Sequence, residues 1–279
     1  LGLFHCFGCG KGGDIFRFYA LMENYTFKET LKLLSRRYGI PYPRFERKPS
    51  DFGKYKIEEI LKEVLKIYKE ELFLENSEGK KYLQGRGFSM EEAKEWELGF
   101  APPVYGFLKE ELKGKYNDED LLNSGVYAKG EKGFYERFRG RIIFPIHSVN
   151  DKLIGFAGRV LTMELPKYIN TQETLSVKKS RVLFGLNRAR KEINKFGYII
   201  VVEGYFDCLR LWQAGFKTAV ATMGTALSQE HGALLKKYTN NIVLCFDSDS
   251  AGQNAALSAL KNLLPYNFKI EMLFLEEGE

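Results

Sequence analysis

Cysteine and histidine are scarce in this sequence, whose 279 residues include four cysteines and three histidines. Cysteines so few and so scattered do not form the disulfide framework of a small secreted protein, so we expect a reducing, cytoplasmic environment. No apolar run reaches the roughly 18 residues that a membrane span requires, and no signal peptide opens the sequence. We therefore expect no membrane partner.

A strong charge of either sign is missing as well. The sequence has 42 Lys and Arg residues against 36 Asp and Glu residues, a net charge of +6 with a pI near 8.9. This mildly basic balance permits an acidic polymer as a partner but does not demand one. The composition is that of a globular protein, and the length is sufficient for two or more units.

Two of the four cysteines have the spacing of a metal site. The sequence begins LGLFHCFGCGKGGD, in which Cys6 and Cys9 are separated by two residues, as in a zinc knuckle. A tetrahedral structural zinc needs four ligands, but Cys208 and Cys245 lie in apolar stretches typical of a buried core, and His5 is too close to Cys6 to complete the site. We therefore expect the missing ligands to precede the sequence. The alternative is that the pair only stabilises a turn.

Hydrophobic patterns divide the chain into four parts, with boundaries at residues 1–40, 41–55, 56–196 and 197–279. The first part contains amphipathic helical patterns, and the second is a polar, proline-containing linker. In the third part, helical spacing runs from residue 57 to 74, and Ser89 followed by Glu92 predicts a helix N-terminus. Residues 141–161 form two apolar runs joined by a turn, which predicts a β-hairpin.

The fourth part alternates strand-like and helix-like segments. The strand-like segments are residues 198–204, 217–224, 240–249 and 268–275, and the helix-like segments between them are residues 206–215, 227–238 and 251–264. This alternation predicts a parallel sheet with helices packed on it. In such sheets ligands bind at the carboxyl ends of the strands.

Four acids lie at the predicted carboxyl ends. Glu203 follows the run YIIVV, Asp207 lies four residues later at the head of a helix, and Asp247 and Asp249 end the run IVLCF. Side chains two residues apart on an extended backbone point the same way, so the aspartate pair and Glu203 should gather three negative charges. A divalent cation would relieve their repulsion, and hard oxygen ligands favour Mg²⁺ or Mn²⁺. The alternative is that the aspartates only form a turn and an N-cap.

These motifs together resemble those of a known family. VVEGYFD and CFDSDSAG resemble the two acidic signatures of the Toprim domain, which bacterial primases, topoisomerases and related nucleases share, and ATMGTALS resembles the loop between them in primases. RGRIIFPIHSVNDKLIGFAGRVL, PKYINTQET and KKSRVLFGLNRA are similar to the basic subdomain that precedes Toprim in bacterial DnaG-type primases. FHCFGCGKGGD is similar to the second half of their zinc ribbon. The chain is thereby identified as a member of that family.

The resemblance implies an α/β fold: a Toprim domain, with a parallel sheet and flanking helices, preceded by a mixed α/β basic subdomain and a partial N-terminal zinc ribbon. Residues 1–40 are then the C-terminal part of the zinc-ribbon domain, 41–55 a linker, 56–196 the N-terminal basic subdomain of the RNA polymerase domain and 197–279 the Toprim domain. The family's first zinc-ligand pair and its third acidic motif, Asp-Pro-Asp, do not occur. We therefore expect the sequence to be truncated at both ends, and to bind zinc poorly without the upstream pair.

The implied activity is that of a DNA primase, a DNA-directed RNA polymerase and nucleotidyltransferase. It joins ribonucleoside triphosphates on a single-stranded DNA template into a short RNA primer, at the cytoplasmic replication fork, with a replicative helicase as the partner of a C-terminal region that this sequence lacks. The implied Mg²⁺ or Mn²⁺ ligands are Glu203, Asp247 and Asp249, with Asp207 as a secondary acid. Glu203 acting on the nucleophile is an alternative. Cys6 and Cys9 are the implied Zn²⁺ ligands.

Nucleotide and template also require cations. From Asp151 to Lys195 ten basic residues face four acidic ones, which concentrates positive charge just before the acidic motifs. The family match assigns nucleotide or template contacts to Arg86, Arg159, Lys167, Tyr168, Asn170 and Lys179, with Arg139 and Arg141 as contacts to the nucleic-acid backbone. Tyr168 stacks on a base in one interpretation and belongs to the core in the other.

Three alternative functions stay open on the sequence. A Toprim nuclease or topoisomerase would use the same acids to cleave DNA, although the primase-like basic subdomain and the zinc-ribbon half argue against it. A zinc-containing DNA-binding module would use the acids only structurally. A phage-type primase joined to a helicase is the third alternative, which stays open because we expect the C-terminal region to be missing from this sequence.

Overall fold

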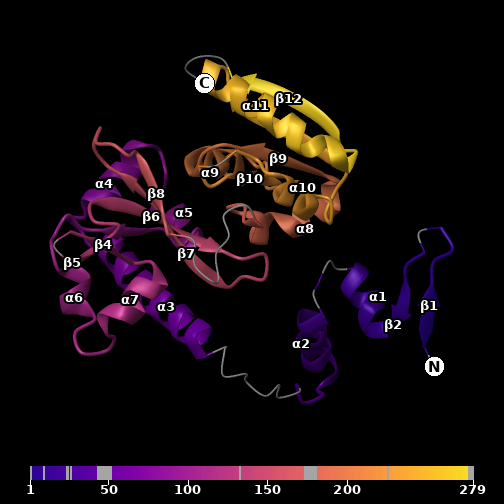
Figure 1. The fold of residues 1–279 in the computed structure, drawn as a ribbon, viewed down its shortest axis with the longest axis horizontal. Helices are drawn as coiled ribbons and strands as arrows, with labels where there is room; N and C mark the ends of the chain where they lie inside the picture. The colour runs from indigo at the N-terminus through magenta and orange to yellow at the C-terminus, as the bar shows by residue number, and fades with distance from the viewer. Residues whose placement is uncertain are drawn as a thin grey trace. The chain divides into compact units, whose positions relative to one another are not determined.

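The structure of the chain is a computed structural model that describes residues 2–8, 10–22, 25, 27–42, 52–131, 133–172, 181–224 and 226–275. Figure 1 shows the order of its helices and strands along the chain. The chain divides into two compact units, residues 1–49 and 50–279. Among the described helices, none has both the length and the apolar character needed to cross a membrane.

The first unit is a β-hairpin followed by two helices. Its elements are β1 (Leu3–His5), β2 (Gly12–Asp14), α1 (Ile15–Met22) and α2 (Phe27–Tyr38). The two strands pair in antiparallel register, and the turn between them contains Cys6, whose carbonyl oxygen accepts a hydrogen bond from the backbone N–H of Gly10 (2.8 Å). Cys9 lies outside the described residues.

The second unit begins with an antiparallel sheet covered by helices. Its elements are α3 (Phe52–Phe73), α4 (Glu78–Gly85), α5 (Met90–Glu95), β3 (Gly99–Ala101), α6 (Phe107–Glu111), α7 (Asp118–Ser124), β4 (Tyr127–Gly130), β5 (Gly133–Glu136), β6 (Arg141–His147), β7 (Leu153–Val160) and β8 (Tyr168–Asn170). The main sheet has the order β3-β6-β7-β8. Its β6–β7 pair is the hairpin that the sequence predicts. The predicted capping box also forms, because Ser89 Oγ accepts from the N–H of Glu92 (3.1 Å) and the Glu92 carboxylate accepts from the N–H of Ser89 (2.8 Å).

A parallel sheet follows in the second unit. Its elements are α8 (Leu186–Phe196), β9 (Tyr198–Val202), α9 (Tyr205–Gln213), β10 (Ala219–Ala221), α10 (Gln229–Leu235), β11 (Asn241–Asp247), α11 (Ser250–Leu263), the 3₁₀ turn η3 (Leu264–Tyr266) and β12 (Lys269–Leu275). The strand order is β10-β9-β11-β12, and all neighbours are parallel. β10 is shorter than the predicted segment 217–224. Beyond Ala221, the N–H of Thr222 still donates to the carbonyl oxygen of Val202, the Thr222 hydroxyl donates to that of Glu203, and Asn170 donates to that of Met223.

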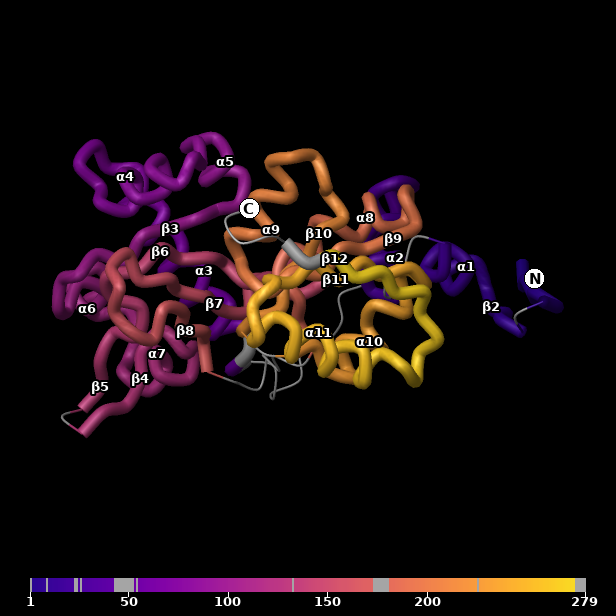
Figure 2. Tube along the Cα trace, turned by 90° about the horizontal axis from the view of Figure 1, so that it is seen from above, coloured from indigo at the N-terminus to yellow at the C-terminus, as the bar shows by residue number. Residues whose placement is uncertain are grey.

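Alternating side chains of β9 and β11 pack into two different cores. One face buries Val201 and Leu244 beneath α8, α10 and α11, and Figure 2 shows α10 and α11 side by side. The other face buries Ile200 and Cys245 in a core that also contains Phe144 of the antiparallel sheet. This second core therefore joins the two sheets. Cys208 is buried in it as well, as its apolar sequence context predicts.

Thr171 attaches the end of β8 to β7 through its side chain. Its hydroxyl accepts a hydrogen bond from the backbone N–H of Phe156 (2.7 Å), and both residues are buried. Replacing Thr171→Val keeps the shape of the side chain but leaves this buried N–H without its acceptor. We expect the free energy of unfolding, measured by urea denaturation, to fall by about 1–3 kcal/mol.

The control for this change is Thr162→Val, at an exposed threonine in the loop after β7. We expect its free energy of unfolding to stay within about 0.5 kcal/mol of the wild-type value. Equal stability of the Thr171→Val protein and the wild type would show that the hydroxyl does not hold β8.

Candidate active site

Parallel pairing of β9 with β11 brings the predicted acids to one edge of the sheet. Glu203 directly follows β9, and Asp247 is the last residue of β11. The two strands are neighbours, with Val201 aligned with Leu244. Asp249 and Asp207 lie at the starts of the helices that leave these two strands. The four acids therefore lie at the carboxyl ends of adjacent strands, where open α/β sheets bind their ligands.

Glu203 is an acid whose surroundings disfavour its negative charge. Its side chain is half-buried, and within the described part of the chain its Oε1 atom has no hydrogen-bond partner. Burial raises the pKa of the Glu203 carboxyl, and the negative charges of Asp247, Asp249 and Asp207 raise it further. A buried carboxylate among like charges is stabilised either by a proton or by a cation.

Asp207 lies in the first turn of α9 and has a structural partner. Its carboxylate accepts a hydrogen bond from the backbone N–H of Gly204 (2.9 Å). Protein atoms around the carboxyl exclude solvent and raise its pKa, and the charge of Asp247 adds to this effect. The N–H of Gly204 and the cations Lys167 and Arg159 act in the opposite direction. Asp207 is thus electrostatically linked both to the acids and to the neighbouring basic residues.

Asp249 is the N-cap of α11. Its Oδ1 accepts a hydrogen bond from the backbone N–H of Gly252 (2.7 Å), so the alternative interpretation of this residue as an N-cap describes part of its role. Gly252 itself is required by close packing, because a Cβ atom there would lie 2.1 Å from the carbonyl oxygen of Asp247. Gly252 in the SDSAG sequence therefore allows the start of α11 to pack closely against the end of β11.

The donor chemistry of this edge fits a divalent cation. Glu203 offers a buried, unpartnered oxygen, and the carboxylates of Asp247 and Asp249 raise its pKa across the edge. Hard oxygen ligands of this kind are those that Mg²⁺ and Mn²⁺ prefer. Within the described residues, no three His, Cys, Asp or Glu side chains are grouped closely enough to hold a metal ion as they stand. The acids are thus gathered at one edge but not assembled into a finished coordination shell.

Cations from the antiparallel sheet lie beside the acids. Arg159 on β7 is opposite Tyr168 on β8, and its Nη1 donates to the Tyr168 hydroxyl (2.8 Å). Arg159 is 9% exposed, whereas Lys167 is exposed at the surface. Both lower the pKa of Asp207, which places their charges within electrostatic reach of the acid edge.

Asn170 connects the two sheets. Its Nδ2 donates to the carbonyl oxygen of Met223 in the loop after β10 (2.7 Å), and its Oδ1 accepts from the hydroxyl of Tyr205 on α9 (2.6 Å). The ring of Tyr168 lies 5.6 Å from that of Tyr205, and burial raises the pKa of Tyr168. Tyr168 and Asn170 thus have protein partners in this structure, and their contacts with nucleotide stay predictions.

The remaining predicted residues have different surroundings. Arg86, in the turn after α4, lies with its Cζ 4.9 Å from the ring centroid of Phe206, next to Asp207 in the chain. Arg141 donates to the carbonyl oxygens of Pro166 and Lys167, and burial lowers its pKa. Arg139 lies over the ring of Tyr105, at 3.6 Å from Cζ to the centroid. Lys179, like Cys9, is outside the described residues.

Part of the positive charge predicted for this region is neutralised within the fold. Lys152 forms an ion pair with Glu58 (3.4 Å), and Arg190 forms one with Asp151 (3.4 Å). Arg159 and Lys167 instead lower the pKa of Asp207 at the acid edge, and Arg86 lies over Phe206, which directly precedes Asp207. Spacing in the sequence does not distinguish these two groups of basic residues.

Sequence reasoning missed the aromatic residues that support these cations. Tyr82 on α4 and Phe206 on α9 lie beneath the guanidinium groups of both Arg86 and Arg159. Two signals were available. Tyr82 precedes Arg86 by four residues, which places the two on one helical face, and Phe206 directly precedes Asp207.

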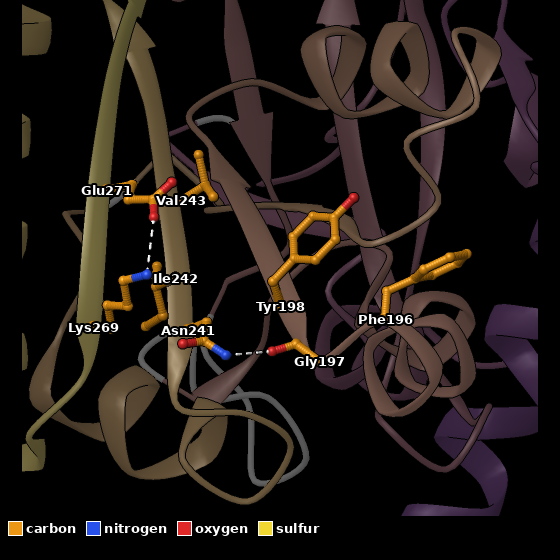
Figure 3. A pocket seen from close by; sticks show the side chains of 8 residues that line it. All are labelled: Phe196, Gly197, Tyr198, Asn241, Ile242, Val243, Lys269 and Glu271. Carbon is orange, nitrogen blue, oxygen red and sulfur yellow. Dashed lines mark hydrogen bonds and ion pairs between the residues drawn. The ribbon is translucent and has the colours of Figure 1, made fainter.

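Two cavities flank the parallel sheet at opposite edges. The first, of about 250 Å³, adjoins Glu203 and is lined further by Thr222, Gly224, Ala226, Leu227, Phe246 and Ala255. The second, of about 410 Å³, lies at the amino ends of β9, β11 and β12. Figure 3 shows the second cavity, with the ion pair of Lys269 and Glu271 (3.5 Å) on its wall. Its position at the amino ends, away from the acids, argues against it as the reaction site.

Family models match almost the whole chain. Residues 1–50 match the CHC2 zinc finger, residues 67–190 the DNA primase catalytic core, N-terminal domain, and residues 197–274 the Toprim domain. The chain is 37% identical to a DNA primase of Thermotoga maritima, over 100% of this chain and 51% of that protein. It is 36% identical to a DNA primase of Staphylococcus epidermidis, over 98% of this chain and 48% of that protein. The chain thus spans about half the length of these curated relatives.

Solved structures agree with these matches. A DNA primase domain from Pseudomonas aeruginosa is similar with a TM-score of 0.75 and 38% identity, over 80% of this chain and 72% of that one. A DnaG primase catalytic domain bound to ssDNA gives a TM-score of 0.74 and 35% identity, over 81% and 73%. The zinc-binding and RNA polymerase domains of the Aquifex aeolicus primase give 0.75 and 34%, over 99% and 68%. The predicted α/β fold with a Toprim parallel sheet is confirmed.

The charge of Glu203 should destabilise the cation-free protein at neutral pH. A folded-state pKa above the unfolded value means that the folded state binds the proton more tightly, so stability falls as pH rises through the folded pKa. With a chelator present, we expect Glu203→Gln to unfold at a higher temperature than the wild type at pH 7. The difference should close as the pH falls towards the unfolded value near 4.3.

Glu271→Gln, which changes a surface carboxylate at the other edge of the sheet, is the control for this comparison. Its unfolding temperature should follow that of the wild type over the same pH range. A Glu203→Gln protein that is less stable than the wild type at pH 7 would show that Glu203 is held by attraction rather than repulsion.

Proposed function

The chain belongs to the family of DnaG-type DNA primases, and on that premise we propose that it carries the site for DNA-templated synthesis of short RNA primers from ribonucleoside triphosphates. The observation that carries the proposal is the meeting of four acids at the carboxyl ends of β9 and β11 with Arg159 of β7 and Lys167, just before β8. Carboxylates bind a divalent metal ion, and basic side chains bind the phosphates of a nucleotide. Nucleotidyl transfer requires both in one place.

We assign Mg²⁺ or Mn²⁺ to Glu203, Asp247 and Asp249, with Asp207 as a secondary acid. When bound, such an ion lowers the pKa of the attacking hydroxyl and neutralises charge on the triphosphate. The alternative role of Glu203 is to act on the nucleophile, by accepting a proton from the 3′-hydroxyl of the growing primer. Asp207 caps the backbone of Gly204 and keeps the start of α9 at the edge.

We assign the triphosphate to Arg86 and Arg159, and a phosphate of the nucleotide or of the template to Lys167. Arg159 is a buried guanidinium, and its Nε has no hydrogen-bond partner within the described residues, so one donor of this group is not used by the protein. Lys167 supplies a mobile point charge at the surface. The further proposed contacts with nucleotide or template are Tyr168, Asn170, Arg139, Arg141 and Lys179.

Zinc, the partners and the domain limits complete the proposal. Cys6 and Cys9 are assigned as ligands of a structural Zn²⁺, in line with the zinc-finger match over residues 1–50. Single-stranded DNA is the proposed template, as the related catalytic domain bound to ssDNA supports. The RNA primer, a replicative helicase and the cytoplasmic replication fork are the remaining proposed partners and location. The proposed limits are 1–40 for the zinc ribbon, 41–55 for the linker, 56–196 for the basic subdomain and 197–279 for Toprim.

The acid assignment is tested by Asp247→Asn and Asp249→Asn, incubated with single-stranded DNA, ribonucleotides and Mg²⁺. Asparagine is also a good N-cap, so the start of α11 should stay intact. We expect RNA synthesis to fall by about a hundredfold or more in each variant, because a neutral amide is a poor ligand for a divalent cation. Binding of single-stranded DNA should not weaken.

The same assay separates the alternative functions. Glu271→Gln is the matched control and should make RNA like the wild type. Cut DNA in place of labelled RNA would support a Toprim nuclease. Full activity of both aspartate variants would mean that the acids are structural, as in a zinc-containing DNA-binding module.

The role of Lys167 predicts a change in salt dependence. A lysine that contacts one phosphate releases about one counterion on binding, so Lys167→Gln should weaken binding of single-stranded DNA and lower the salt slope by roughly 0.7. The slope is measured from affinities over a range of NaCl concentrations. Lys269→Gln, at the opposite edge of the sheet, should leave the slope unchanged. An unaltered slope for Lys167→Gln would remove this residue from the nucleic-acid interface.

A further inference from the structure

Tyr82 is in contact with Arg86 in two ways. It lies on α4, four residues before Arg86, and its hydroxyl accepts a hydrogen bond from the Nε atom of that arginine (2.9 Å). The Cζ atom of Arg86 also lies 5.4 Å from the centroid of the Tyr82 ring. Arg86 is exposed while Tyr82 is half-buried, so the tyrosine is the fixed member of the pair.

The same aromatic surface supports a second arginine. The Cζ atom of Arg159 lies 5.8 Å from the centroid of Tyr82 and 5.2 Å from that of Phe206, and the Cζ atom of Arg86 lies 4.9 Å from Phe206. Two like charges therefore share two rings, and attraction to the ring faces offsets part of their repulsion. Two guanidinium groups held side by side form a receptor for an anion with several oxygen atoms.

The turn that carries Arg86 is fixed to α9 from the other side. Gln213 donates from Nε2 to the carbonyl oxygen of Gly87 (3.0 Å), and Arg210 donates to the carbonyl oxygen of Arg86. Arg210 also lies over the ring of Phe88, at 4.5 Å. These anchors lie on the helix that holds Asp207 in its first turn. One helix thus sets the backbone of Arg86 relative to the acids, and only its side chain needs a further support.

We propose that Tyr82 is a positioning residue, whose hydroxyl and ring hold Arg86 beside Arg159 in the arrangement that receives the triphosphate of the incoming ribonucleotide. The inference rests on the proposed function, since it needs the two arginines to bind phosphate. A free arginine at the surface samples many rotamers, and binding must then select one of them. The hydroxyl of Tyr82 restricts Nε before the nucleotide arrives.

The test replaces the hydroxyl alone, in Tyr82→Phe, with Tyr116→Phe as the matched control. Tyr116 also uses its hydroxyl in a hydrogen bond, to Glu63 of α3 (2.8 Å), but contacts neither arginine through it. We expect Tyr82→Phe to bind inorganic triphosphate, measured by calorimetry, about fivefold more weakly, the size of one lost hydrogen bond. In primer synthesis the KM for ribonucleotides should rise by a similar factor while kcat changes less than twofold. Tyr116→Phe should change neither.

Removal of the ring is the second variant. Tyr82→Leu removes the aromatic ring beneath both arginines, so the affinity for triphosphate should fall further than in Tyr82→Phe.

The stability of the Tyr82→Phe variant is the second measurement. Its thermal midpoint should match that of the wild type, because the ring and its packing stay. A loss of affinity without a loss of stability is the result that a purely structural role of Tyr82 would not give.

Two results would overturn the proposal, and they differ in meaning. If Arg86→Ala loses tenfold or more in triphosphate affinity while Tyr82→Phe loses none, Arg86 binds phosphate without the help of Tyr82, and the proposed function stands. If Arg86→Ala and Arg159→Ala both bind triphosphate like the wild type, the phosphate assignment in the proposed function is wrong, and the role of Tyr82 falls with it.

Discussion

The repulsion between the carboxylates at one sheet edge is the constraint around which this fold is arranged. Parallel pairing of β9 and β11 fixes the backbones of Glu203 and Asp247 at neighbouring strand ends. Interactions between like charges are strong where solvent is excluded. The buried side chains of the two strands hold the edge together on both faces. The apolar packing of the sheet therefore holds the carboxylates close together despite their mutual repulsion.

The short sequence EGYFD shows how the fold combines this charge with packing. Glu203 ends in the acid cluster, and the N–H of Gly204 is capped by Asp207. Tyr205 and Phe206 are buried against Phe144 of the antiparallel sheet, with ring centroids 5.1 Å apart in each case. Five consecutive residues thus supply two acids, a cap and the aromatic contact between the two sheets. A change in the packing of Tyr205 or Phe206 would also move the acids.

The sequence predicts those features that depend on local pattern. Strand alternation and the parallel-sheet rule place Glu203 and Asp247 at one edge, and the spacing of Ser89 and Glu92 identifies the capping box. The platform beneath Arg86 and Arg159 could not be predicted in this way. It needs Tyr82 and Phe206, more than a hundred residues apart, to meet through tertiary packing. For the same reason the sequence could not show that Asn170 joins the two sheets.

The incomplete coordination at the edge has a physical reason under the proposed function. Asp249 has one oxygen committed to the N–H of Gly252, and within the described residues no three acids are grouped closely enough to hold an ion. Three carboxylates held at coordination distance without a cation would repel one another more strongly than the carboxylates in this structure do. Mg²⁺ is commonly held by one or two carboxylates together with the phosphates of the substrate. Under the proposed function, neither the acids nor the two arginines form a complete site alone. The site is completed when a triphosphate lies between Arg86 and Arg159 on one side and Glu203 on the other.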